Sequence, residues 1–340
     1  MNPVITELVA ETSWLPMAFF LMLGLAVILY AILDGYDLGV GMLLPRHSEA
    51  QRDRMIASIG PFWDANETWL VLAVGLLLIA FPVAHNIILR ELYIPSAIML
   101  IGLILRGVSF DFRAKAIPHR KRLWDWSFKA GSIVAALSQG YMLGRFTTGF
   151  DDSVFAYSFS MLSAFSVAAA YAFIGASWLI MKTEGELQIR SIWWARRSGW
   201  LMALGTISIC VVNITLYPSI YAKWLAQPLG ILLLPVPLIC VVLFIINDRM
   251  LKHMPFDNDG ACWLPFFSAV SIFLMCFIGL GFSYYPYVVP NQLTIWQAAS
   301  ADESLAFLFY GAAFVVPTIL AYTIFSYRVF WGKAEALEYV

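Results

Sequence analysis

Two pairs of acidic residues stand out because each pair has helical spacing inside an otherwise apolar stretch. Asp34 and Asp37 are three residues apart in LDGYDLGVGM, and Asp64 and Glu67 repeat this spacing in DANET. Residues three apart share one face of a helix. Acidic side chains within apolar helices pair with cations or, together with water, relay protons. Ion pairing and proton relay are therefore the chemistry that these residues indicate.

An arginine lies in a third apolar stretch, five residues deeper than the next acidic residue, Asp111. A charge at bilayer depth costs about 2.5–3.5 kcal/mol on the insertion scale, so such a group needs a partner or water. We predict that this residue, Arg106, pairs with Asp37 or Asp64. An obligatory partner of this kind favours a functional role over a solvated surface charge.

The ends of the third and fourth apolar stretches carry further charges. Asp111 and Lys115 close one stretch, and Asp125 and Lys129 open the next, four residues apart in WDWSFK. We predict that Asp111 pairs with Lys115 or Lys129. For any one of these residues a structural role is an equal alternative, because the helix dipole stabilises carboxylates in a first turn and interfacial lysines extend towards water.

Histidines and cysteines give no sign of a redox centre. The four histidines fall in connecting segments or at a helix end, and the four cysteines include no C-x-x-C motif. A haem between spans usually needs an axial His, or a Met partnered with one. We therefore expect no haem and no metal site in this chain.

The amino-acid composition excludes an ordinary soluble protein. Its 340 residues are 61% hydrophobic and only 13% charged, with a mean hydropathy of +0.77 and a net charge of -1. An ordinary soluble domain is about 25% charged, so a soluble or disordered chain is excluded. The balanced charge indicates no nucleic-acid partner.

Nine apolar stretches are long enough to cross a membrane, which takes about 20 residues of helix. Continuous apolar runs favour helices over a barrel, and the first stretch lacks the features of a signal peptide. We predict an all-α polytopic membrane protein. The predicted spans are 14–44, 64–84, 87–110, 124–146, 155–181, 193–217, 227–247, 262–289 and 303–330.

Basic residues alternate between the two sets of connecting segments. One set carries 16 of the 21 Lys and Arg residues and the other carries three. The excess of positive charge on the cytoplasmic side predicts an N-terminus outside and a cytoplasmic C-terminus. We predict one membrane domain over residues 1–340, with a polar four-helix half at 14–146, an apolar four-helix half at 155–289 and a ninth helix at 303–330.

Several sequence motifs together indicate a resemblance to a known family. These are DGYDLGVGM at 34–42, IGPFWDANETW at 59–69, RGVSFDFRAK at 106–115, WDW at 124–126 and TEGEL at 183–187. In this order they resemble subunit II of the cytochrome bd-type quinol oxidases. The short loop between the sixth and seventh spans is similar to the cyanide-insensitive branch of that family.

The resemblance implies a nine-helix, haem-free subunit in the bacterial cytoplasmic membrane. Its partner, subunit I, carries two b-type haems, a third haem of d or b type, and the site where quinol is oxidised. The complex reduces dioxygen to water with protons from the cytoplasm. The resemblance implies that subunit II stabilises subunit I and contributes part of the proton-entry path. A quinone bound by subunit II and a small single-helix accessory subunit are further features that the resemblance allows.

The resemblance also assigns roles to residues. Positions of the family's hydrophilic path match Asp37, Asp64, Arg106, Asp111 and Lys115. The wider predicted polar cluster adds Asp34, Glu67, Asp125 and Lys129. Trp69 matches a position linked to oxygen access from the lipid.

Two other classes of function are weighed against the oxidase. Interior charges also suit a secondary transporter or channel, although here they gather at one surface. A passive scaffold would use the polar cluster only to dock a partner. Transport by the isolated chain would favour the first, and full turnover after neutralisation of several acids would favour the second.

Overall fold

The protein is described by a computed structural model that covers residues 13–216, 218–225, 230, 233–256 and 259–334. Long helices dominate it, with one short two-stranded hairpin. The elements are α2 (Leu15–Leu43), α3 (Glu49–Ile59), α4 (Trp63–Ala80), α5 (Pro82–Lys115), α6 (Pro118–Thr147), α7 (Val154–Lys182), α8 (Gly185–Leu216), α9 (Pro218–Leu225), α11 (Pro235–His253), α12 (Leu264–Tyr284), β1 (Tyr287–Val289), β2 (Leu293–Thr294), α13 (Ile295–Ala298) and α14 (Asp302–Val329).

Within the described residues, seven helices are long and apolar enough to cross a membrane, namely α2, α4, α5, α7, α8, α12 and α14. The predicted span 124–146 lies on α6. The predicted span 227–247 lies on α11 only from Pro235 onwards, and its residues 227–229 and 231–232 lie outside the described residues. Neither helix is among the seven. α6 carries charged residues, and α11 begins only at Pro235. The helical membrane fold is confirmed, whereas the count of nine and the orientation stay predictions. The eighth predicted span is too long, because its last residues form β1.

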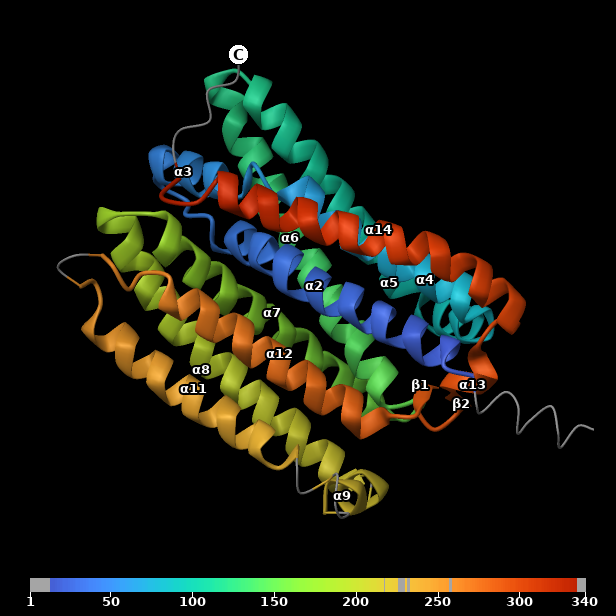
Figure 1. Ribbon diagram of the computed structural model, residues 1–340. Helices are drawn as coiled ribbons and strands as arrows, with labels where there is room; N and C mark the ends of the chain where they lie inside the picture. The colour runs from blue at the N-terminus through green and yellow to red at the C-terminus, as the bar shows by residue number, and fades with distance from the viewer. Residues whose placement is uncertain (1–12, 217, 226–229, 231–232, 257–258, 335–340) are drawn as a thin grey trace, which may run out of the picture.

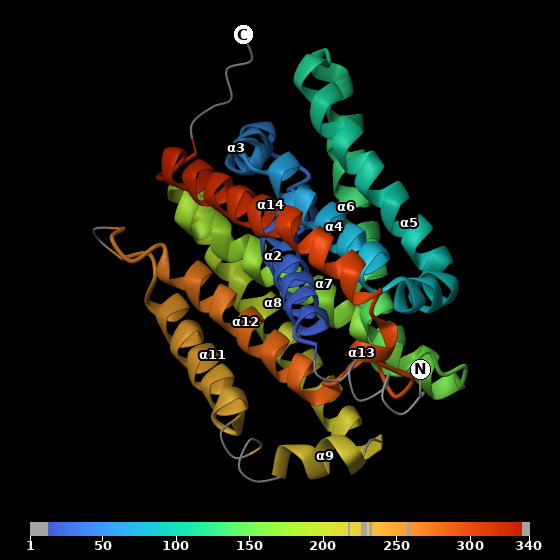
Figure 2. The ribbon, with the colours of Figure 1, turned by 45° about the vertical axis from the view of Figure 1, so that its right-hand side comes forward.

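Helix α2 lies at the centre of the bundle. It packs against α4, α6 and α7, and more lightly against α12 and α14 (Figure 1, Figure 2). All ten residues from 32 to 41 are buried, so this part of the helix has no side facing lipid. Any polar side chain in the segment must therefore find its partners inside the protein.

Two glycines allow α2 and α7 to cross with their backbones in contact. A Cβ added to Gly39 would overlap the backbone oxygen of Tyr171, and a Cβ added to Gly175 would lie 2.6 Å from the backbone of Gly39. No Cβ can occupy this space. The crossing joins the two predicted four-helix halves, whose division stays a prediction.

The segments rich in basic residues meet at one end of the bundle. The contacts that join them include Arg113 Nη2 to Asp53 Oδ1 at 2.6 Å, Arg190 Nη1 to Gln51 Oε1 at 2.6 Å, and Lys333 Nζ to the Thr183 carbonyl at 2.9 Å. The opposite end holds α9, α13 and the β1–β2 hairpin (Figure 1). The predicted alternation of the loops agrees with this arrangement.

Candidate functional site

A buried arginine joins three helices at the centre of the site. Arg106 on α5 places Nη2 2.6 Å from Asp34 Oδ1 on α2 and also pairs with Glu67 on α4. Arg106 is 1% exposed and Asp34 is fully buried. The predicted partners, Asp37 and Asp64, are therefore wrong. Spacing alone placed both Asp34 and Asp37 near this helix face, and the rotation of α2 decides which of them meets α5.

Asp37 is held by an amide instead of a cation. Asn66 Nδ2 on α4 donates to Asp37 Oδ2 at 2.8 Å and lies 3.0 Å from the Tyr36 hydroxyl. The Tyr36 hydroxyl is 2.6 Å from that of Tyr327 on α14. The sequence interpretation missed Asn66 and Tyr327. Asn66 could have been found, because it lies between the two acidic residues of DANET and shares their apolar surroundings.

A further chain of hydrogen bonds begins one helical turn from Asp34. Gln139 Nε2 on α6 donates to the Tyr30 hydroxyl at 2.7 Å, and the Tyr171 hydroxyl on α7 donates to Gln139 Oε1 at 2.7 Å. With a rise of about 1.5 Å per residue, Tyr30 lies about 20 Å along the helix axis from Leu43, the end of α2. The polar groups therefore extend from the end of the bundle towards its middle.

Several atoms of this site have spare hydrogen-bonding capacity. Asp37 Oδ1, Arg106 Nε and Arg106 Nη1 are buried without a hydrogen-bond partner among the described residues. Buried polar atoms usually bind protein groups or ordered water. These atoms leave the buried group with donors and an acceptor that its protein neighbours do not use.

A second charged cluster lies nearer the end of the bundle. Asp125 on α6 is 2.6 Å from Arg52 Nε on α3 and 2.5 Å from Arg113 Nε on α5. Arg113 also contacts Asp53 at 2.6 Å. These pairs fasten α3 to the ends of α5 and α6. Asp125 is therefore placed as a structural anchor between helices.

Three of the predicted path residues lie on the surface of this chain. Asp64, Asp111 and Lys115 are exposed, with no ion pair inside the part of the chain that the structure describes. The predicted pairing of Asp111 with Lys115 or Lys129 is wrong. Lys129 Nζ instead donates to the Leu44 carbonyl at 2.8 Å. Asp111 lies on the outward face of α5, which only the packing of that helix determines.

Trp69 lies in the interior, with no exposed surface. It belongs to the main apolar core and does not face lipid on this chain. Its assignment to oxygen access stays a prediction.

Comparison with known proteins shows the family of this chain. The sequence matches the family model for cytochrome bd terminal oxidase subunit II over residues 15–330. The chain belongs to this family. This confirms the resemblance drawn from the motifs, whereas the cyanide-insensitive branch stays a prediction.

Relatives of full length show the same similarity. Subunit 2 of the cytochrome bd-I ubiquinol oxidase of Escherichia coli is 29% identical, with 93% of this chain and 94% of that protein covered. Subunit 2 of the cytochrome bd ubiquinol oxidase of Bacillus subtilis is 28% identical, with coverage of 94% and 97%. A chain in the structure of bd oxidase from Geobacillus thermodenitrificans superposes with a TM-score of 0.75 at 17% identity, covering 94% of this chain and 99% of that one. This last likeness shows a common fold.

Proposed function

We propose that this chain is the haem-free subunit that supports the haem-bearing subunit of its oxidase and helps to deliver protons to it. Family membership makes it a subunit of a respiratory quinol oxidase, a multi-pass protein of the bacterial inner membrane that works with a subunit I. In the proposal, subunit I holds the haems and oxidises quinol, while this chain carries no redox centre. Family membership also favours the oxidase over the transporter alternative.

The observation that carries the proton-path proposal is the buried group formed by Arg106, Asp34 and Glu67 beside Asp37. Protons consumed at a buried haem must cross apolar protein, and acidic side chains with water provide relays through it. Buried charges that served only stability could be replaced by apolar residues at little cost or with a gain. Their presence in the interior of the bundle therefore favours a functional role.

The path would run from the end of the bundle inwards. Exposed carboxylates would collect protons at the surface, and Glu67, whose side chain is 28% exposed, would link the surface to the interior. Arg106 would position the carboxylates and offset their charge. In the proposed order, the surface residues are Asp64, Asp111 and Lys115, the link is Glu67, and the inner residues are Asp34, Asp37 and Arg106.

The decisive experiment replaces Asp37 in the purified complex. We expect Asp37→Asn to assemble with an unchanged haem spectrum and to lose oxygen-consumption rate by about tenfold, equivalent to about 1.4 kcal/mol in the barrier. The control Asp302→Asn removes an exposed carboxylate at the start of α14, at the other end of the bundle, and should retain full activity.

Membrane-potential generation in proteoliposomes provides the second measurement. A relay defect lowers proton uptake together with oxygen consumption. Full turnover of Asp37→Asn and of Asp34→Asn, in assembled complexes, would exclude the relay and leave the scaffold role.

A further inference from the structure

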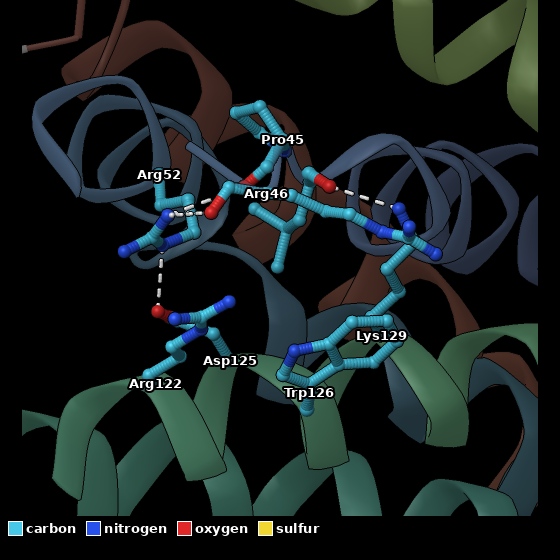
Figure 3. A pocket seen from close by; sticks show the side chains of 8 residues that line it. Pro45, Arg46, Arg52, Arg122, Asp125, Trp126 and Lys129 are labelled. Carbon is cyan, nitrogen blue, oxygen red and sulfur yellow. Dashed lines mark hydrogen bonds and ion pairs between the residues drawn. The ribbon is translucent and has the colours of Figure 1, made fainter. Parts of the chain in front are cut away.

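A small basic pocket lies where the end of α2, helix α3 and the start of α6 meet (Figure 3). Its volume is about 20 Å³, room for roughly one water-sized group. The charged and aromatic residues around it are Arg46, Arg52, Arg122, Asp125, Trp126 and Lys129. Four cations therefore face one carboxylate.

That carboxylate is already engaged. Asp125 pairs with Arg52 at 2.6 Å and with Arg113, which approaches from outside the pocket, at 2.5 Å. Within the described chain, neither Arg46 nor Arg122 forms an ion pair, and both are exposed. The lining of the pocket thus keeps a net positive charge, because Asp125 is the one acidic residue among the residues that line it.

Lys129 is the third cation of the pocket without an ion pair in the described chain, and it lies close to Arg46. Lys129 gives one hydrogen bond to the Leu44 carbonyl at 2.8 Å, and an ammonium has three donors. Arg46 and Lys129 line the same small pocket, so their positive charges repel each other. Cations held together in this way are stabilised by an anion bound between them.

Apolar surface adjoins the cations. Trp126 is 44% exposed and Leu123, three residues earlier on the same face of α6, is 62% exposed. The Arg46 guanidinium lies 5.2 Å from the centre of the Trp126 ring. Tryptophan beside basic residues is typical of the membrane–water interface. A ligand with an anionic head and an apolar tail fits this pairing of surfaces.

We infer that this pocket binds the phosphate group of an anionic phospholipid from the adjoining leaflet. The phosphate oxygens contact Arg46 and Lys129, Arg122 attracts the phosphate from the opposite rim of the pocket, and an acyl chain runs along Leu123 and Trp126. The small volume favours a headgroup that lies on the surface over a free anion enclosed by protein. The site is independent of the proposed proton path, because Arg46 and Arg122 have no part in that path.

The experiment uses the complete oxidase, delipidated in detergent and titrated with short-chain phosphatidylglycerol. Bound lipid is counted by native mass spectrometry. Basic residues near an anionic lipid each strengthen binding by about fivefold, so the double variant Arg46→Gln, Arg122→Gln should bind phosphatidylglycerol about 25-fold more weakly. The control Arg120→Gln removes an exposed cation on the same turns of α6 that does not line the pocket, and should bind as the parent does.

Three further arms decide the identity of the ligand. Phosphatidylcholine, which has no net charge, should bind weakly to the parent and should not respond to the double substitution. Inorganic phosphate that bound as tightly as phosphatidylglycerol would overturn the lipid assignment. Equal binding of phosphatidylglycerol by parent and double variant would overturn the site. Loss of subunit I from the double variant with lipid binding retained would assign the pocket to a protein partner and would equally overturn the inference.

Discussion

Removal of the central arginine gives the sharpest prediction. In Arg106→Gln, Asp34 is left fully buried without its counter-charge, and Glu67 loses its partner at a half-exposed position. Removing one member of a buried ion pair costs about 3–5 kcal/mol, because an uncompensated charge remains. We therefore expect a marked loss of stability even though the substituted side chain is uncharged and of moderate size.

The burial of the pair decides how much of this cost is expected. Arg106 and Asp34 are both excluded from water, so no solvent compensates Asp34 once Arg106 is gone. The Glu67 side chain is 28% exposed, so solvent compensates its loss in part. The expected loss of about 3–5 kcal/mol therefore comes mainly from Asp34.

The assay is the apparent melting temperature of the purified complex at pH 7, with haem content as a check on assembly. Arg249→Gln is the matched control, because it removes an exposed arginine that has no ion pair in the described chain. The double variant Arg106→Gln, Asp34→Asn removes both charges and should recover most of the lost stability. Oxygen consumption should nevertheless stay low, since a relay carboxylate is gone.

Two results would refute this reasoning. One is an Arg106→Gln complex as stable as the control at pH 7, which would mean that Asp34 is solvated. The other is a deficit that does not change when Asp34→Asn is added, which would mean that the loss arises from packing and not from charge.

Three other substitutions test separate parts of the structure. Gly39→Ala should reduce the yield of assembled complex in size-exclusion chromatography, because its Cβ overlaps the backbone of α7, whereas Gly75→Ala, with open space around it, should not. Asn66→Leu should lower the melting temperature, since the loss of the donor to buried Asp37 costs about 1–3 kcal/mol; an unchanged value would show that water replaces the amide. Asp64→Asn should leave stability unchanged, because the residue is exposed, and should lower oxygen consumption and membrane potential; unchanged values of both would remove Asp64 from the path.

The membership of the polar cluster was predictable in part. Asp34, Asp37, Glu67 and Arg106 were identified as candidates because ionisable groups in apolar stretches are costly and need partners. The structure brings these four together at one end of the bundle. Asn66 and the tyrosines were missed, since neutral polar residues in a helix cost less and give a weaker signal.

The ion-pair partners of these residues could not be predicted from their spacing in the sequence. A residue at a given position points in a direction set by the rotation of its helix about its own axis, and a shift of one residue turns the side chain by about 100°. This is why Arg106 meets Asp34 and not Asp37, and why Asp111 points away from the bundle. It also explains why Trp69 lies in the core, whereas its link to oxygen access stays a prediction.

The sequence by itself determined the membrane environment, the helical class, the family and the end of the molecule at which charged residues gather. These properties depend on sums over many residues, namely hydropathy along each stretch and the count of basic residues in each loop, and such sums tolerate local error. Only the tertiary structure decided which carboxylate is paired, which is exposed and where the basic pocket forms. Those outcomes depend on contacts of about 3 Å between residues distant in the chain, and close packing at points such as Gly39 and Gly175 fixes the helix rotations that create them.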